Sequence, residues 1–187
     1  MPNVQYVNGG KPQVGGAVWI APVGTSLPTS TSASLAAAFK DLGYISEDGV
    51  TNTPSRETDS VTAWGGDTIL DVQTSFTDQF QFTLVESTNI DAKKLVFGKN
   101  NVSGTLSTGI TTNVNGKELD EWSIVIDTLL RDGGVHRMVI PKCKVVEVGD
   151  IVYNNSDPVG YEVTVTGYPD SSNNTHYEYE KASTVSA

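Results

Sequence analysis

A two-residue alternation between residues 76 and 86 constrains the fold more than any other feature of the sequence. On one side of an extended chain the residues are large and apolar: Phe76, Phe80, Phe82 and Leu84. On the other side they are polar: Thr77, Gln79, Gln81 and Thr83. Because successive side chains of a β-strand point to opposite faces, this segment predicts a half-buried strand with one wettable face.

Other segments also predict strands. Tyr161, Val163 and Val165 alternate with polar residues in 160–168, and Trp122, Ile124 and Ile126 share one side of 121–130. Further strands are predicted at 15–21, at 68–74 as a hairpin partner of 76–86, and at 135–148 after the turn signal at 131–134. Hydrophobic residues reach only 37% and charged residues 18%, and Thr and Val suit strands. The sequence therefore predicts a mainly β protein.

Two segments predict helices. Thr88 with Asp91 three residues later fits a capping box, and Gly98 fits a C-terminal cap, so residues 88–98 predict one well-defined helix. Residues 34–41 predict a short helix, and the Gly- and Asn-rich residues 99–117 predict a second loop or a hairpin.

The 187 residues predict one domain with polar appendages. We expect a flexible N-terminal arm at 1–14, a loosely held polar tail at 169–187 and a long polar loop at 46–66. A loop of this length inside a compact domain usually has a function or is disordered. It carries Trp64, which we interpret either as an interface anchor or as the centre of a local loop core.

Charge and targeting signals set the expected environment. The formal net charge of −10 repels nucleic acid, whose binding depends on Lys and Arg, but it does not exclude a protein past which DNA must move without sticking. One cysteine allows no intrachain disulfide, and the sequence shows neither a signal peptide nor an apolar run long enough to span a bilayer. We expect synthesis in a cytoplasm and no membrane insertion.

The sequence offers little catalytic chemistry. The two histidines, His136 and His176, lie in a strand segment and a polar tail, and Cys143 lies in a predicted strand. No phosphate-binding glycine loop is present, and Asp48-Gly49 and Asp132-Gly133 indicate turns, not calcium loops. Carboxylates from distant strands still leave a glycosidase open. We predict a protein that is not an enzyme and needs no metal or cofactor.

Three stretches carry a family resemblance. Residues 42–51 (LGYISEDGVT), 55–57 (SRE) and 63–67 (AWGGD), followed by the 76–86 strand and the 88–98 helix, resemble the major tail tube proteins of siphophages, the phages with long non-contractile tails. The resemblance covers about two-thirds of the chain. Related tube proteins occur in contractile tails and in type VI secretion.

The resemblance implies a β-sandwich or open barrel with one flanking helix, found as a structural virion protein in the tail and assembled in the host cytoplasm. Six subunits would form a ring, and stacked rings would form a hollow tube that delivers DNA without binding it specifically. The chain would contact itself, the tape measure protein, the tail tip or baseplate, and the tail terminator. The 46–66 loop would reach an adjacent subunit or ring, with Arg56, Glu57, Asp59 and Trp64 as its candidate contacts.

We further predict an acidic lumen, with Asp127 and Glu162 on polar strand faces as the candidate lumen residues; outward-facing carboxylates are the alternative. Two other functions remain open from the sequence. One is the tube protein of a secretion or bacteriocin device. The other is a carbohydrate-binding or hydrolysing β-sandwich with Trp64 and Trp122 as sugar platforms, although Trp122 alternates with Ile124 like a core residue.

Overall fold

A nine-stranded antiparallel sheet organises the chain, which a computed structural model describes over residues 6–13, 16–131 and 133–183. The strand order is β3-β2-β8-β9-β10-β5-β4, with β1 added to β8 and β11 added to β9. The elements run β1 (Lys11–Pro12), β2 (Val18–Pro22), β3 (Lys40–Asp41), β4 (Ile45–Thr62), β5 (Thr68–Leu84), α1 (Ile90–Phe97), β6 (Val102–Thr105), β7 (Gly109–Thr112), β8 (Glu121–Leu129), β9 (Val135–Val148), β10 (Tyr161–Gly167) and β11 (Tyr177–Lys181). The fold is mainly β with one helix in the described residues, as predicted.

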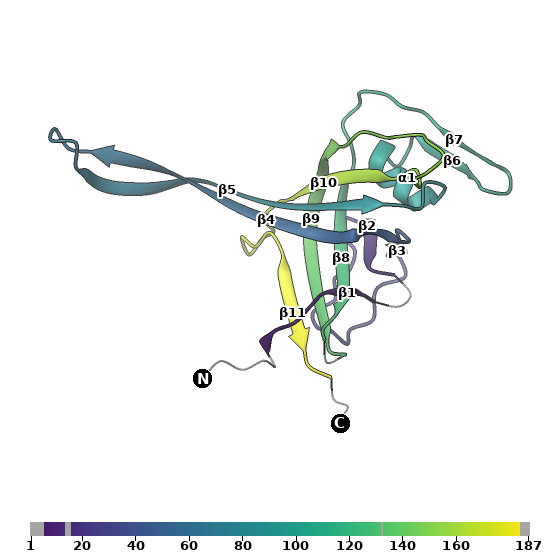
Figure 1. The fold of residues 1–187 in the computed structure, drawn as a ribbon, viewed down its shortest axis with the longest axis horizontal. Coiled ribbons are helices and arrows are strands. Elements are labelled where there is room, and N and C mark those ends of the chain that lie inside the picture. Colours follow the sequence, from purple (N-terminus) through teal and green to yellow (C-terminus); the bar gives the residue numbers. More distant parts are fainter. Residues whose placement is uncertain (1–5, 14–15, 132, 184–187) are drawn as a thin grey trace.

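The sheet folds into two layers at strand β9 (Figure 1). One edge of β9 pairs with β8, while its other edge pairs with β11 along Val135–Val139 and with β10 along 143–148. Figure 1 shows β4, β5 and β10 crossing the strands β8 and β9. The layers pack on a common core of apolar residues from β2, β5, β8, β9, β10 and α1: Ile20, Phe80, Phe82, Leu84, Leu95, Ile124, Ile126, Ile140, Val163 and Val165.

The predicted alternations are confirmed for the residues that fill this core. Phe80, Phe82 and Leu84 of β5 and Val163 and Val165 of β10 are buried, each stabilising the fold by about 1.5–3 kcal/mol through removal of apolar surface from water. Trp122 is also buried, as its alternation with Ile124 indicated.

Helix α1 is confirmed with a different cap. Asn89, not Thr88, begins the helix, because its side-chain oxygen accepts hydrogen bonds from the backbone of Asp91 and Ala92 at 3.0 and 3.3 Å. Gly98 ends it with φ 98°, a conformation that favours glycine. No helix among the described residues is long and apolar enough to cross a bilayer.

Several predicted boundaries were wrong. Residues 34–41 form no helix; Lys40–Asp41 is strand β3, and Phe39 packs in a second core cluster with Ala21, Val125 and Val139. A helix of that length is costly to nucleate, so packing decides its conformation. Residues 99–117 contain the β6–β7 hairpin, one of the two predicted alternatives.

Both chain ends contain strands where arms were expected. Lys11–Pro12 pairs with β8, and Tyr177–Lys181 pairs with β9 because Tyr177 and Tyr179 pack on the second core cluster. Residues 1–5, 14 and 184–187 of these predicted ends lie outside the described residues.

The predicted 46–66 loop is also a strand over most of its length. Ile45–Thr62 forms β4 and pairs with β5 in one long hairpin, and residues 68–74 continue the same strand as 76–84 and do not form its partner. Apolar periodicity did not predict this strand, because β4 is held by backbone pairing with β5 and none of its side chains is fully buried.

Candidate functional site

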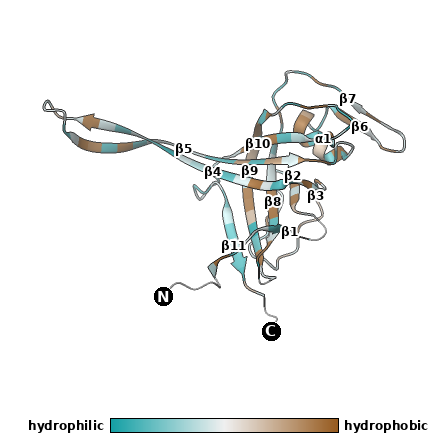
Figure 2. Ribbon diagram, viewed as in Figure 1, coloured by the Kyte–Doolittle hydropathy of each residue, from teal (hydrophilic) through white to brown (hydrophobic). Residues whose placement is uncertain are grey.

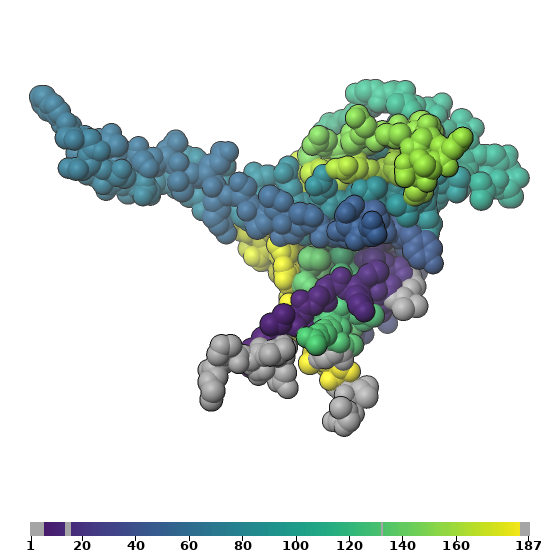
Figure 3. Space-filling view, in the orientation of Figure 1, coloured from purple at the N-terminus to yellow at the C-terminus, as the bar shows by residue number. Residues whose placement is uncertain are grey.

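The distal part of the β4–β5 hairpin extends away from the rest of the subunit. Residues 53–74 are exposed throughout, and Figure 3 shows them within a narrow blue arm that projects from the body. At the tip, Ala63 N donates to Asp67 O at 2.8 Å and Gly66 N donates to Ala63 O at 2.9 Å. Trp64 sits on this turn with a relative exposure of 105%, so it belongs to no local loop core.

The arm carries an apolar face. Val61 lies directly opposite Leu70, and Val72 lies opposite Asp59 on the same side of the hairpin. All three apolar residues are exposed, and Figure 2 shows the brown of hydrophobic residues near the end of the arm. Within the described chain this part of β4 pairs with no strand except β5, so its outer backbone groups also lack a sheet neighbour. Exposed apolar surface and open edges are typical of a surface that packs on another chain.

The four residues predicted for inter-subunit contact all lie on this arm. The Arg56 guanidinium stacks over Phe76 at 4.3 Å from the ring centroid, and Glu57 accepts a hydrogen bond from Ser75 at 2.9 Å. These contacts join the two strands where the arm leaves the body. Asp59 lies farther out, and Trp64 lies at the tip.

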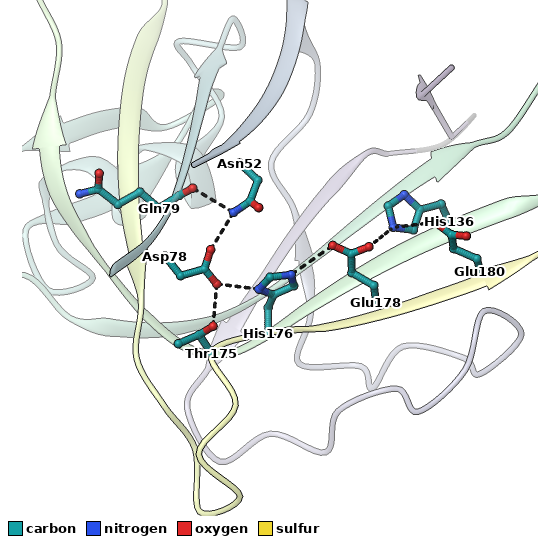
Figure 4. Close-up of polar contacts among 8 residues, drawn as sticks. All are labelled: Asn52, Asp78, Gln79, His136, Thr175, His176, Glu178 and Glu180. Atoms are coloured by element: carbon teal, nitrogen blue, oxygen red, sulfur yellow. Dashed lines mark hydrogen bonds and ion pairs between the residues drawn. The ribbon is translucent and has the colours of Figure 1, made fainter. Parts of the chain in front are cut away.

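The base of the arm is tied to the C-terminal segment through Asp78. This fully buried carboxylate accepts hydrogen bonds from Asn52 Nδ2 at 2.8 Å, Thr175 Oγ1 at 2.7 Å and His176 Nδ1 at 2.6 Å, as Figure 4 shows. Burial raises the pKa of Asp78, but these hydrogen bonds and the attraction of His176 together lower that pKa below its ordinary value. Sequence reasoning missed this residue, although a carboxylate on the apolar side of the 76–86 alternation was the available signal.

Strands β4, β5 and β10 present a polar face on the side away from the core. Thr164 lies opposite Gln81, and Thr166 lies opposite Gln79, which donates to the threonine hydroxyl at 3.4 Å. The candidate lumen residue Glu162 is exposed on this face and accepts a hydrogen bond from Gln81. The face therefore combines hydroxyl, amide and carboxylate groups.

Asp127 does not lie on an exposed polar face, and that part of the prediction was wrong. It is 3% exposed and forms an ion pair with Arg137, whose Nε lies 2.6 Å from Asp127 Oδ1. The reason is that β8 is covered on both sides: the common core packs on one, and the second core cluster with the 30–33 segment packs on the other. The polar residue Asp127 in the alternation of β8 therefore indicates a buried ion pair and not a surface exposed to solvent.

The groups considered for chemistry have structural partners. Burial, with a smaller effect of Glu121, raises the pKa of the Cys143 thiol far above its ordinary value, and the thiol donates to Trp122 O at 3.3 Å. His136 and His176 each contact one oxygen of the Glu178 carboxylate. Trp122 is buried and offers no ring face to a sugar.

Comparison with known proteins agrees with this arrangement. Among curated proteins, no sequence matches the chain. A family model described as "Phage tail tube protein" matches residues 13–184, which includes both layers, the arm, the helix and strand β11. The chain thus belongs to the phage tail tube protein family, whose members are structural components of the virion tail.

Proposed function

We propose that this chain is the major tail tube subunit of a siphophage, that six copies close into a ring, and that stacked rings form the hollow tube through which DNA leaves the virion. The observation that carries the proposal is the exposed β4–β5 arm. It places Val61, Trp64, Leu70 and Val72 in solvent, where a lone subunit gains nothing from them.

In the proposed tube the arm reaches a neighbouring subunit or ring. Its apolar face and Trp64 would be buried there, with Asp59 at the edge of the contact, while Arg56 and Glu57 keep the arm rigid through their contacts with Phe76 and Ser75. A paired arm loses less conformational entropy on docking than the flexible loop predicted from the sequence would lose.

The polar face of β4, β5 and β10, continued by β9, is the proposed lumen wall. Among the described strands β4 lies at one end of the sheet order, so pairing between subunits at this edge would remove open backbone groups. Four strands from each of six subunits would give about 24 strands and a barrel about 45–50 Å across between backbones, which is wide enough for a DNA duplex. Glu162 would contribute negative charge that repels phosphate.

Electron microscopy of the purified full-length protein tests the proposal. We expect concentrated protein, or protein mixed with tail tip complexes, to form hollow tubes whose rings show six-fold symmetry. A variant in which Leu70 and Val72 are both replaced by Ser should stay folded but remain unassembled. Tubes of normal length from that variant would remove the arm from the proposed contact, and filaments without a lumen would contradict the tube itself.

A further inference from the structure

Strands β9 and β11 bring one histidine and two glutamates together. Glu180 lies directly opposite His136 in the antiparallel ladder, and Glu178 lies opposite Met138, so these side chains share one face. His136 Nε2 is 3.2 Å from Glu178 Oε2 and 3.8 Å from Glu180 Oε1. The side chains are 19%, 46% and 62% exposed in the order His136, Glu178, Glu180, so an ion from solvent can reach them.

The distances from His136 Nε2 to the two carboxylate oxygens are close to those between ligands around one metal ion. Zinc lies about 2.0–2.1 Å from imidazole nitrogen and carboxylate oxygen, so two ligands at a tetrahedral angle lie about 3.3–3.4 Å apart. The two distances from His136 Nε2 bracket this value, and all three ligand atoms lie within 4.8 Å of one another. One imidazole with two carboxylates suits zinc and neighbouring transition metals, whereas Mg²⁺ and Ca²⁺ prefer oxygen alone.

A second set of contacts orients one of these ligands. The other oxygen of Glu178, Oε1, lies 3.1 Å from His176 Nε2, and His176 Nδ1 lies 2.6 Å from the buried Asp78. Figure 4 shows this chain of contacts running from Asp78 through His176 and Glu178 to His136. Hydrogen bonds of this kind hold ligand carboxylates in place in metal sites. They fix one oxygen of Glu178 to His176 and leave Oε2 directed at His136.

We propose that His136, Glu178 and Glu180 bind one divalent transition metal ion, with Zn²⁺ as the best-matched ion, and that the ion fastens strand β11 to β9. In the described chain β9 is the one strand that pairs with β11. An ion bound across this ladder stabilises the folded subunit by an amount that grows with the logarithm of the free ion concentration above its dissociation constant, because the ligands separate when β11 detaches. The same chain of contacts connects the site to Asp78 in β5, at the base of the arm.

Calorimetric titration of the chelator-treated full-length protein with Zn²⁺ tests the site. We expect one ion per chain and a melting temperature that rises with Zn²⁺ concentration. Glu180→Gln removes an exposed ligand without disturbing the core and should weaken Zn²⁺ binding by at least tenfold, while His136→Ala should abolish it. His176→Asn should weaken binding by about 10–100-fold, as expected for a residue that orients a ligand.

Glu162→Gln, which removes an exposed carboxylate on β10, is the matched control and should bind Zn²⁺ like the unmodified chain. Visible absorption of the Co²⁺-loaded protein provides a second measurement, because its bands report nitrogen and oxygen ligation and should change in His136→Ala. The proposal is overturned if the unmodified chain binds no Zn²⁺ or Co²⁺, or if folded Glu180→Gln binds Zn²⁺ as tightly as the unmodified chain.

Discussion

Arg137 donates two hydrogen bonds to Asp127 inside the subunit, from Nε to Oδ1 at 2.6 Å and from Nη2 to Oδ2 at 2.8 Å. Its remaining nitrogen, Nη1, donates to the backbone oxygens of Ser30 and Ala33 at 3.0 and 2.6 Å. The pair therefore fastens the loop that precedes β3 to the β8–β9 ladder. Its function is structural, and it withdraws Asp127 from any role in an acidic lumen.

Breaking this pair should destabilise the subunit. Arg137→Ala leaves the Asp127 carboxylate buried without its partner, so we expect the free energy of unfolding to fall by about 3–5 kcal/mol in urea titrations. Lys142→Ala removes the half-exposed ion pair with Glu121 on the same ladder and should cost less than about 1 kcal/mol. Equal losses of unfolding free energy in the two variants would show that the buried Arg137–Asp127 pair stabilises the fold no more than the half-exposed Lys142–Glu121 pair does.

The contacts of Asp78 predict a pH dependence of stability. Because hydrogen bonds hold its folded pKa below the unfolded value, the ionised carboxylate stabilises the fold fully above about pH 4, and this contribution is lost as pH falls through the lower folded pKa. The difference in unfolding free energy between the unmodified chain and Asp78→Asn should therefore be largest near pH 6 and should shrink below pH 4.

The Asp78 measurement is made in EDTA so that metal ions do not contribute. Thr175→Val removes one of the three donors to Asp78 and serves as the intermediate variant. It should show a weaker pH dependence than the unmodified chain and a stronger one than Asp78→Asn. A difference between the unmodified chain and Asp78→Asn that stays constant from pH 6 to pH 2.5 would contradict the assignment.

Shortening the arm should separate folding from assembly. Because Glu57 pairs with Ser75, residues 58–74 can be replaced by Asn-Gly, a two-residue turn that suits a hairpin. The buried part of β5 and its pairing with β10 are unaffected, so we expect a monomer with normal circular dichroism and thermal stability that forms no tubes in the electron microscope. A longer deletion into residues 50–52 would also remove Val50, which packs against the core. A loss of assembly could then result from a loss of folding, and the two effects would not be separated.

Charge reversal at Glu162 tests the proposed lumen. Glu162→Lys places a cation on the polar face of β10 in each subunit of the proposed ring, and each added Lys attracts phosphate with a strength that falls as salt rises. Phage carrying this variant should assemble tails but eject DNA more slowly, with the delay relieved by salt. Glu162→Gln is the control and should change ejection little. A tube map with Glu162 on the outer surface would disprove the assignment.

The sequence by itself determined the strands whose side chains form the core. Phe80, Phe82 and Leu84 in β5 and Val163 and Val165 in β10 are buried as their alternation predicted, because burial of one strand face requires apolar residues at every second position. Alternation also identified β8, and the turn signal at 131–134 identified β9. Capping residues identified the helix α1, whose start differed only in the choice of capping residue.

The tertiary structure alone decided what lies against each polar face. Asp127 and Glu162 occupy similar polar positions in alternating strands, yet Arg137 covers the first and solvent reaches the second, because a segment distant in sequence packs over β8. The strand β4 was equally hidden from sequence reasoning. Its order comes from backbone hydrogen bonds to β5, which any residue except proline can donate, so its side chains carry no apolar period that would predict it.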